Sequence, residues 1–278
     1  MPAPTAETLA AALRPLTDAP ERAAVLCDVD GTLAPIVERA GDAQVPKRAA
    51  RLLAALAGRY GCVACISGRA AADARRLVGV GRISYAGAHG AEILAPGERS
   101  AEAIPAFATW TDPIHRFVAD RDDADLRRLR VRIEDKGPIM AFHWRGAPDE
   151  DEARTRVEAI AGEAEADGLA IHWGRKVLEV RPPVPISKGR AVDELVRRSG
   201  TRTALFGGDD ATDLDAFDAL DALSESGDLD AAVRVGVASD EGPEAIVERA
   251  DLVVGGPAGF LDVLEVLAEA PAAPPGAP

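Results

Sequence analysis

Short apolar runs alternate with helical patterns over the first third of the chain. The runs at residues 23–27, 62–66 and 83–86 have the length and composition of buried strands. Helical spacing of apolar residues is found before and between them, at about 5–16, from Pro46, and at 69–77. We expect Thr5 to cap the first of these helices and Tyr60 to share one side of the second with Leu53 and Leu56. The order strand–helix–strand–helix–strand predicts a parallel sheet.

The pattern changes in the middle of the chain. It shows a helical region at about 105–128, strand-like runs at 131–135 and 139–145, a helix at about 149–167, and runs at 169–173 and 177–181. This αββαββ order predicts an antiparallel layer backed by two helices. The prolines within 182–185 indicate a stiff connector. A helix near Lys188 and strand-like runs at 203–206, 233–237 and 252–254 then resume the parallel pattern.

Together these patterns predict an α/β fold in two parts. Residues 1–104 and 184–278 are expected to form a discontinuous, Rossmann-like core on a parallel sheet, and residues 105–183 an inserted α+β domain. The tail from Pro271 is rich in Pro and Ala and is expected to be disordered.

The composition narrows the range of partners. A formal net charge of −14 over 278 residues argues against nucleic acid and anionic membranes, although a few placed Lys and Arg can still attract an anionic substrate. Cys27, Cys62 and Cys65 lie in apolar runs, so we expect buried thiols rather than a redox pair. The sequence shows neither a signal peptide nor an apolar run of membrane-spanning length, so we expect a soluble, cytoplasmic protein.

Two carboxylates directly follow the first apolar run. Asp28 and Asp30 are two positions apart, so an extended backbone directs both to one side. Gly31 then lets the backbone turn and approach a ligand closely. One carboxylate can attack while the other handles protons, and both can help to hold a hard cation such as Mg²⁺. The alternative is a plain acidic turn, while an EF-hand loop is not expected because its third acidic ligand and its sixth-position glycine are missing.

Polar groups also follow the second apolar run and begin the helix after the connector. Ser67, Gly68 and Arg69 follow residues 62–66, where a hydroxyl and helix N-terminal amides can bind a phosphate oxygen. The alternative for Ser67 is an ordinary N-cap. Lys188 stands in a first helical turn, against the macrodipole, which favours a phosphate or carboxylate partner, and the alternative is a solvated lysine.

A second acidic group follows the run 203–206. Asp209 and Asp210 come directly after it, which favours a metal role for at least one of them. For Asp213, Asp215 and Asp218 the alternative is the acidic start of a helix.

The order DxDGT, strand-Ser, Lys, GDDxxD resembles the haloacid dehalogenase superfamily of phosphotransferases, over about 20–104 and 184–260. Within it the chain is similar to trehalose-6-phosphate phosphatases, in ISGR (66–69), AGAHG (86–90), VRIEDKG (131–137), FHWR (142–145), GRKVLEVRP (174–182), SKG (187–189) and GGDDATDLDAF (207–217). The αββαββ insert matches the cap domain of that family. One departure is Leu214, where the family often has Glu, so any contribution from that glutamate is absent.

The resemblance implies a Mg²⁺-dependent phosphatase that hydrolyses trehalose 6-phosphate through an aspartyl-phosphate. Asp28 would be the nucleophile and Asp30 the general acid and base, with Ser67 and Lys188 binding the phosphoryl group. The Mg²⁺ would be held by Asp28, the backbone carbonyl of Asp30, and Asp209, with Asp213 and Asp210 fixing its waters from outside. The remaining substrate-binding residues implied are Gly68, Arg69, Glu134, Lys136, Arg145, Lys176 and Glu179, and for those in the cap a solvated strand face is the alternative.

Other functions are compatible with most of these motifs. A phosphatase of sucrose phosphate or mannosyl-3-phosphoglycerate would differ only in the cap, and a phosphomannomutase-like isomerase would return the phosphate to its substrate. A non-catalytic sugar-phosphate sensor would usually lack the nucleophile, yet Asp28 and Asp30 are intact. We expect a small sugar phosphate as the partner and a monomeric protein.

Overall fold

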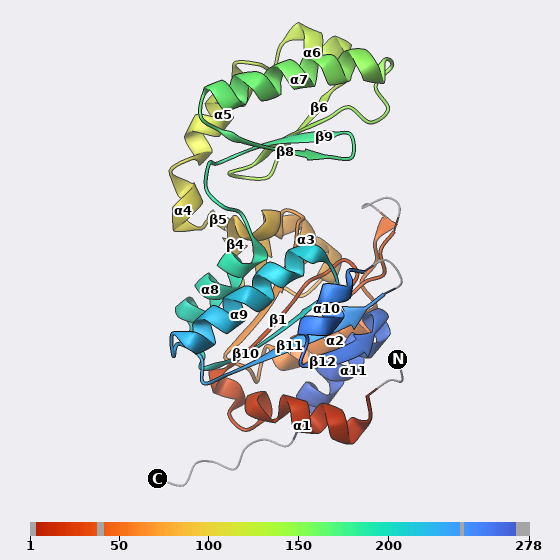
Figure 1. The fold of residues 1–278 in the computed structure, drawn as a ribbon, viewed down its shortest axis with the longest axis vertical. Helices are drawn as coiled ribbons and strands as arrows, with labels where there is room; N and C mark the ends of the chain where they lie inside the picture. Colours follow the sequence, from red (N-terminus) through yellow and green to blue (C-terminus); the bar gives the residue numbers. More distant parts are fainter. Residues whose placement is uncertain (1–3, 38–41, 240–241, 271–278) are drawn as a thin grey trace. The chain divides into compact units, whose positions relative to one another are not determined.

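The computed structural model describes residues 4–37, 42–239 and 242–270 (Figure 1). The chain divides into two compact units: unit 1 comprises Met1–Ala101 and Ser187–Pro278, and unit 2 comprises Glu102–Ile186. The expected limits of the inserted domain, 105 and 183, fall close to these boundaries. The expectation of a disordered tail from Pro271 lies outside the described residues.

Unit 1 is built on a mainly parallel sheet with the strand order β12-β11-β10-β1-β2-β3-β4-β5. The strands from β12 to β3 pair in parallel, and β4 pairs antiparallel with β3. The parallel α/β core expected from the sequence is thereby confirmed. The strands are β1 (Ala23–Cys27), β2 (Cys62–Ile66), β3 (Ser84–Gly87), β4 (Glu92–Leu94), β5 (Glu102–Ala103, where unit 2 begins), β10 (Thr203–Gly208), β11 (Ala231–Ala238) and β12 (Leu252–Gly255).

Helices cover both faces of this sheet. Leu205 of β10 belongs to the same apolar cluster as Leu13, Leu53 and Leu264 of α1, α2 and α11. The next residue, Phe206, faces the other way and packs edge-on against Phe217 of α9, with ring centroids 6.3 Å apart. In Figure 1, α9 lies beside α8 in front of the strands. The helices are α1 (Ala6–Thr17), α2 (Lys47–Leu56), α3 (Ala71–Val78), α8 (Lys188–Ser199), α9 (Leu214–Glu225), α10 (Glu244–Arg249) and α11 (Gly256–Glu269), with short 3-10 turns at Pro20–Arg22, Ala88–Gly90 and Ala211–Asp213.

Unit 2 is a four-stranded antiparallel sheet in the order β6-β7-β9-β8, with helices packed on it. Its core joins Phe142 and Leu178 of the sheet to Phe117, Leu126 and Val157 of α5, α6 and α7. The elements are α4 (Pro105–Ala108), α5 (Thr111–Ala119), α6 (Ala124–Arg128), β6 (Arg132–Asp135), β7 (Met140–His143), α7 (Glu150–Ala166), β8 (Ala170–Gly174) and β9 (Val177–Arg181).

The expectation of two backing helices in unit 2 is wrong, because the region 105–128 is three helices. The first ends at Ala108 and the second begins at Thr111. The third begins after Asp123, whose side chain accepts hydrogen bonds from the backbone of Asp125 and Leu126 and so starts a new helix.

Two details of unit 1 also differ from expectation. Helix α2 ends at Leu56, so Tyr60 lies beyond it, and the Tyr60 hydroxyl donates to the Leu267 carbonyl at 3.0 Å. Strands β4 and β5 were not expected, because they are too short to show a periodic pattern. Thr5 does cap α1, accepting from the Thr8 N–H at 3.2 Å, as expected.

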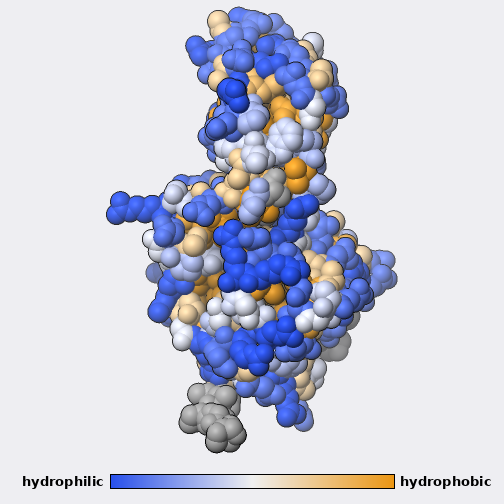
Figure 2. Space-filling model, turned by 90° about the vertical axis from the view of Figure 1, so that its left-hand side faces the viewer, coloured by the Kyte–Doolittle hydropathy of each residue, from blue (hydrophilic) through white to orange (hydrophobic). Residues whose placement is uncertain are grey.

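The three cysteines are buried and free, as expected. Burial raises the pKa of Cys62 to about 11, so this thiol stays protonated and unreactive at neutral pH. The face drawn in Figure 2 is mostly hydrophilic with small hydrophobic patches. Among the described helices, none has the length and apolar character needed to cross a membrane.

Candidate active site and metal centre

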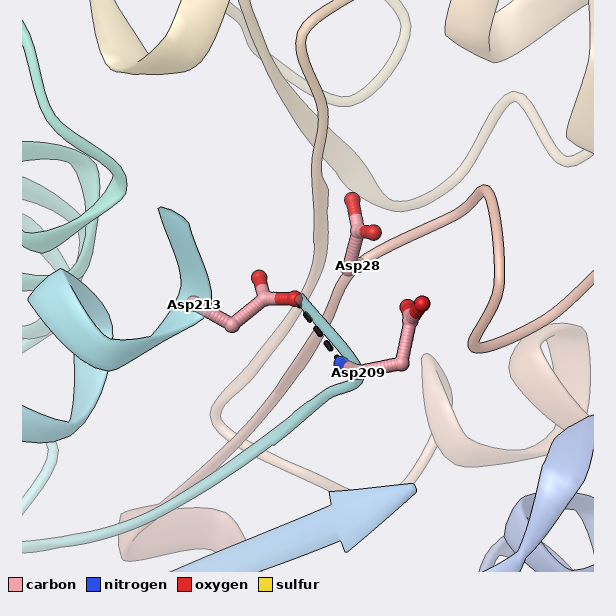
Figure 3. Close-up of side chains that lie close together, drawn as sticks. All are labelled: Asp28, Asp209 and Asp213. Atoms are coloured by element: carbon pink, nitrogen blue, oxygen red, sulfur yellow. Dashed lines mark hydrogen bonds between the residues drawn. The ribbon is translucent and has the colours of Figure 1, made fainter. Parts of the chain in front are cut away.

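The parallel pairing of β1 with β10 brings two distant acidic segments together. Cys27 lies opposite Gly207, and the Asp28 N–H donates to the Gly207 carbonyl at 2.9 Å. Asp28 and Asp209 therefore leave the same edge of the sheet. The carboxylates of Asp28, Asp209 and Asp213 each offer an oxygen within 4.8 Å of the others, and all three residues are buried (Figure 3). We call these three residues the acidic trio.

Gly31 makes room for one member of the trio. Its φ of +93° is a left-handed value, and a Cβ at this position would lie 2.0 Å from Oδ2 of Asp209. The next residue, Thr32, is fully buried and donates its hydroxyl to Oδ1 of Asp209 at 2.9 Å. The turn after Asp30 thus fixes the position of Asp209 across the sheet.

Asp213 fastens the turn that carries Asp209. Its Oδ2 accepts the N–H groups of Asp209 and Asp210 at 2.9 and 3.0 Å, and its Oδ1 accepts from Nζ of Lys188 at 2.7 Å. Asp213 does stand at an acidic helix start, directly before α9, but it is completely buried and bonds to Lys188 and to the Asp209 turn. Asp210 caps the Ala211–Asp213 turn through its side chain.

Lys188 lies between two members of the trio. Its Nζ is 3.0 Å from Oδ1 of Asp28 and 2.7 Å from Oδ1 of Asp213, and the residue is only 2% exposed. Burial alone would lower the pKa of Lys188, but the two carboxylates outweigh it and raise that pKa. The anionic partner expected from the helix dipole is confirmed.

The trio suits a divalent cation. Burial raises the pKa of Asp209 to about 6, and it also raises the pKa values of Asp28 and Asp213. Lys188 offsets one of the three negative charges, which leaves buried charge that a divalent cation would neutralise. Carboxylate oxygens are the ligands that Mg²⁺ prefers. The trio therefore forms a buried acidic group that can bind a metal ion.

Asp30 faces a different partner from the trio. Arg69 donates to both of its carboxylate oxygens, Nε to Oδ2 and Nη2 to Oδ1, each at 2.7 Å. The sequence indicated Arg69 only as a substrate ligand, and nothing in the spacing of the two residues pointed to this ion pair. The metal contribution expected of Asp30 was its backbone carbonyl, and it stays a prediction.

Ser67 lies on the turn between β2 and α3. It is 1% exposed, and its hydroxyl oxygen accepts from the Arg69 N–H at 3.1 Å. That bond leaves the hydroxyl hydrogen available for an anion. The N-cap of α3 is Ala70, so the alternative that Ser67 caps this helix is wrong. At Gly68, a Cβ would lie 2.7 Å from Cε1 of His89.

Three of the five residues expected to read a sugar cluster on the sheet of unit 2. Lys136 Nζ is 2.9 Å from Oε1 of Glu179 and 4.0 Å from Oε2 of Glu134. Two further residues, which the sequence did not indicate as ligands, complete this cluster: His143 contacts Glu134 at 2.7 Å, and Arg181 Nε donates to Glu179 at 3.0 Å. Burial alone would raise the pKa of Glu179, but the charges of Lys136 and Arg181 lower it to about 2.

The other two expected sugar ligands lie elsewhere in unit 2. Lys176, in the β8–β9 turn, pairs with Oε2 of Glu150 at 2.5 Å beside a hollow of about 370 Å³. Arg145 donates to the Arg175 carbonyl at 3.1 Å. Neither has a contact with the cluster around Glu179 among the hydrogen bonds and ion pairs of the described residues.

Comparison with known sequences gives a family match over most of the chain. A family model described as Trehalose-phosphatase matches residues 26–245. A trehalose-phosphate phosphatase of Mycobacterium avium is 38% identical over 213 residues, covering 71% of this chain and 51% of that protein. An uncharacterized glycosyl hydrolase of Mycobacterium tuberculosis is also 38% identical, over 206 residues, covering 72% of this chain and 15% of that protein. The chain thus spans about half, or less, of the length of these curated relatives.

Solved structures share the fold. A trehalose-6-phosphate phosphatase related protein superposes with a TM-score of 0.64 at 23% identity, covering 88% of this chain and 96% of that one. The trehalose-6-phosphate phosphatase of Aspergillus fumigatus gives a TM-score of 0.60 at 24% identity, covering 96% and 98%. At these identities the likeness establishes the fold.

Proposed function

The chain belongs to the trehalose-phosphatase family, and on that premise we propose that it is a phosphatase that hydrolyses trehalose 6-phosphate to trehalose and inorganic phosphate. The observation that carries the proposal is the meeting of Asp28, Lys188, Asp209 and Asp213, from three separate segments of the chain, at one edge of a parallel sheet. Their arrangement suits the transfer of a phosphoryl group to a carboxylate.

In the first half-reaction, a carboxylate oxygen of Asp28 attacks phosphorus while the bond from phosphorus to the sugar oxygen breaks. Asp30, entering the cycle protonated, gives its proton to that departing oxygen, and trehalose leaves. In the second, Asp30 takes a proton from water, whose oxygen attacks phosphorus. The bond to Asp28 then breaks, which releases inorganic phosphate and restores both residues.

Asp28 and Asp209, with the backbone carbonyl of Asp30, would hold Mg²⁺. The ion would supply positive charge, which reduces the repulsion between the substrate phosphate and the carboxylates. Asp213 would not bind the ion directly but would fix its waters, because both Asp213 oxygens already bind Lys188 and the Asp209 turn. Lys188 lies 3.0 Å from Oδ1 of Asp28 and offsets the negative charge of this carboxylate, and Oδ2 would make the attack.

The turn between β2 and α3 would bind the phosphate together with Lys188. Ser67 presents its hydroxyl hydrogen, and the amide of Gly68 lies in the same turn. Arg69 binds both oxygens of Asp30 and so orients this side chain, and it must release one of them before Asp30 can carry the proton that it exchanges with the substrate oxygen and with water. These donors stabilise the charge that moves to the equatorial oxygens in the transition state.

The nucleophile is tested by replacing Asp28 with Asn, which removes the attacking charge and keeps the shape. We expect phosphate release from trehalose 6-phosphate with Mg²⁺ to fall by at least about 10³-fold. Asp18→Asn, an exposed carboxylate of the same unit, serves as the control and should keep wild-type activity. An Asp28→Asn protein that turns over at the wild-type rate would exclude this mechanism.

The sugar is read, we propose, by Glu134, Lys136 and Glu179, which offer paired donors and acceptors on one sheet. Lys136→Met should reduce kcat/KM for trehalose 6-phosphate by about 10-fold or more, because a sugar hydroxyl bound at this site would lose the Lys136 ammonium as its hydrogen-bond donor. Its effect on a small aryl phosphate should be much smaller. Equal losses on both substrates would count against a sugar-reading role, and faster turnover of sucrose phosphate or mannosyl-3-phosphoglycerate would replace the proposed substrate.

We propose that the protein acts as a monomeric enzyme in the cytoplasm. The acidic net charge supports a small-molecule partner over nucleic acid or an anionic membrane. The intact Asp28 and Asp30 favour a phosphatase over a sensor.

A further inference from the structure

The segment that joins β3 to β4, residues 87–92, has an unusual backbone. Ala88 and His89 have φ values of 51° and 57°, in the left-handed region that residues with a side chain rarely adopt. Two such residues in succession persist only where surrounding contacts hold them, and they concentrate at functional sites. The proposed reaction uses no residue of this segment, although the segment carries most of the AGAHG motif.

Backbone hydrogen bonds join this segment to the turn that carries Ser67. The Ala88 N–H donates to the Arg69 carbonyl at 2.8 Å, and the His89 N–H donates to the Ser67 carbonyl at 3.0 Å. The His89 ring lies against Gly68, where a Cβ would be only 2.7 Å from it. The left-handed backbone therefore serves to bring residues 88 and 89 against the turn.

Glu92 holds the start of α3, directly after the same turn. The N-cap of α3 is Ala70, which has no side-chain acceptor, and the buried Glu92 supplies one from β4. Its Oε1 accepts the Ala71 N–H at 2.7 Å. Gly87 leaves the space for this contact, because a Cβ there would lie 2.6 Å from Oε1 and 2.1 Å from the Ala71 nitrogen.

We propose that Glu92 is a positioning residue for the phosphate-binding turn. By accepting the Ala71 N–H it fixes the first turn of α3, and with the two bonds from residues 88 and 89 it sets where the Ser67 hydroxyl and the Arg69 guanidinium lie. Arg69 in turn holds Asp30. The inference rests on the proposed function, because its effect is on the chemical step.

The test compares two substitutions of Glu92 in the full-length protein. Glu92→Leu removes the acceptor and should lower kcat for trehalose 6-phosphate by about 10- to 100-fold with KM changed less than about threefold, because displaced groups act mainly in the transition state. Glu92→Gln keeps an acceptor oxygen and should restore kcat to within about threefold of wild type. A merely structural role would lower the amount of folded enzyme and leave the kcat of the folded fraction unchanged.

Gly87→Ala tests whether displacing the start of α3 disturbs the turn, without altering Glu92 itself. Alanine tolerates the backbone at Gly87, where φ is −110°, so any loss comes from displacing the carboxylate and the start of α3. Gly81→Ala is the matched control, because a Cβ there meets nothing within 4 Å. We expect Gly87→Ala to lose kcat as Glu92→Leu does, while Gly81→Ala keeps it. Thermal unfolding of each variant checks that it is folded, and if Glu92→Leu does not fold, a folded Gly87→Ala variant with the wild-type kcat overturns the inference.

Two results would overturn this inference without affecting the proposed function. One is an active wild-type enzyme whose folded Glu92→Leu and Gly87→Ala variants keep the wild-type kcat. The other is a Glu92→Gln variant as impaired as Glu92→Leu. A wild-type protein that releases no phosphate with Mg²⁺ would instead overturn the proposed function, and this inference with it.

Discussion

At the scale of single residues, the site depends on one buried lysine. Lys188 is in contact with Asp28 and Asp213, and each of the three is at most 4% exposed. A buried ion pair adds little net stability, since both charges lose their water, but removing one partner leaves an uncompensated buried charge. Lys188 therefore matters to folding as well as to chemistry.

Lys188→Met should destabilise unit 1 by about 3–5 kcal/mol, because it leaves two buried carboxylates without their cation. Urea unfolding followed by circular dichroism measures the change. Lys47→Met replaces an exposed lysine at the start of α2 and should shift the free energy of unfolding by about 0.5 kcal/mol or less. Similar effects of the two substitutions would show that the Lys188 contacts are not essential to the fold.

At the scale of elements, the cluster around Glu179 makes the sheet of unit 2 sensitive to acid. The pKa of Glu179 is about 2 in the folded protein, below its ordinary value of 4.5, because Lys136 and Arg181 stabilise the carboxylate. A depressed pKa means that the folded state holds the proton less tightly than the unfolded state. The stabilisation is then complete above about pH 4.5 and is lost as the pH falls towards 2.

A comparison of the wild type with Glu179→Gln tests whether Glu179 makes the sheet of unit 2 sensitive to acid. The wild type should exceed the variant in unfolding free energy by up to about 3 kcal/mol at neutral pH. That difference should shrink steadily between pH 4.5 and pH 2. A difference that does not change over this interval would mean that Glu179 titrates normally in the folded protein.

The elements also show which parts of the fold follow from sequence. The expected runs 23–27 and 62–66 match β1 and β2 residue for residue, because every position of both strands is buried and apolar. The break between α5 and α6 within the region 105–128 follows from local capping by Asp123, which periodicity does not register. The motifs indicated the acidic trio, Lys188 and Ser67. The Arg69–Asp30 pair and the Glu92 contact depend on side-chain directions in turns, so spacing could not reveal them.

At the scale of the whole molecule, the tyrosines and the tryptophans are divided between the two units. Both tyrosines, Tyr60 and Tyr85, belong to unit 1, whereas the three tryptophans, Trp110, Trp144 and Trp173, belong to unit 2. Tryptophan emission therefore reports unit 2 alone. Each unit also has its own apolar cluster, so each has a core that can support separate unfolding.

Lys188→Met should therefore lower the unfolding midpoint measured by whole-chain circular dichroism and leave the midpoint measured by tryptophan emission unchanged. The reason is that its contacts all lie in unit 1. A shift of both midpoints by the same amount would mean that the two units unfold as one cooperative body.

The insertion of unit 2 has a consequence for biosynthesis. Thr32 and Asp209, which meet across the paired β1 and β10, are separated by 177 positions. A ribosome must therefore produce all of unit 2 before the central strand gains its second neighbour. Until then that strand offers an open row of amides and carbonyls to any other nascent polypeptide. Aggregation during synthesis is thus a greater hazard for this protein than its finished, fully paired central strand would suggest.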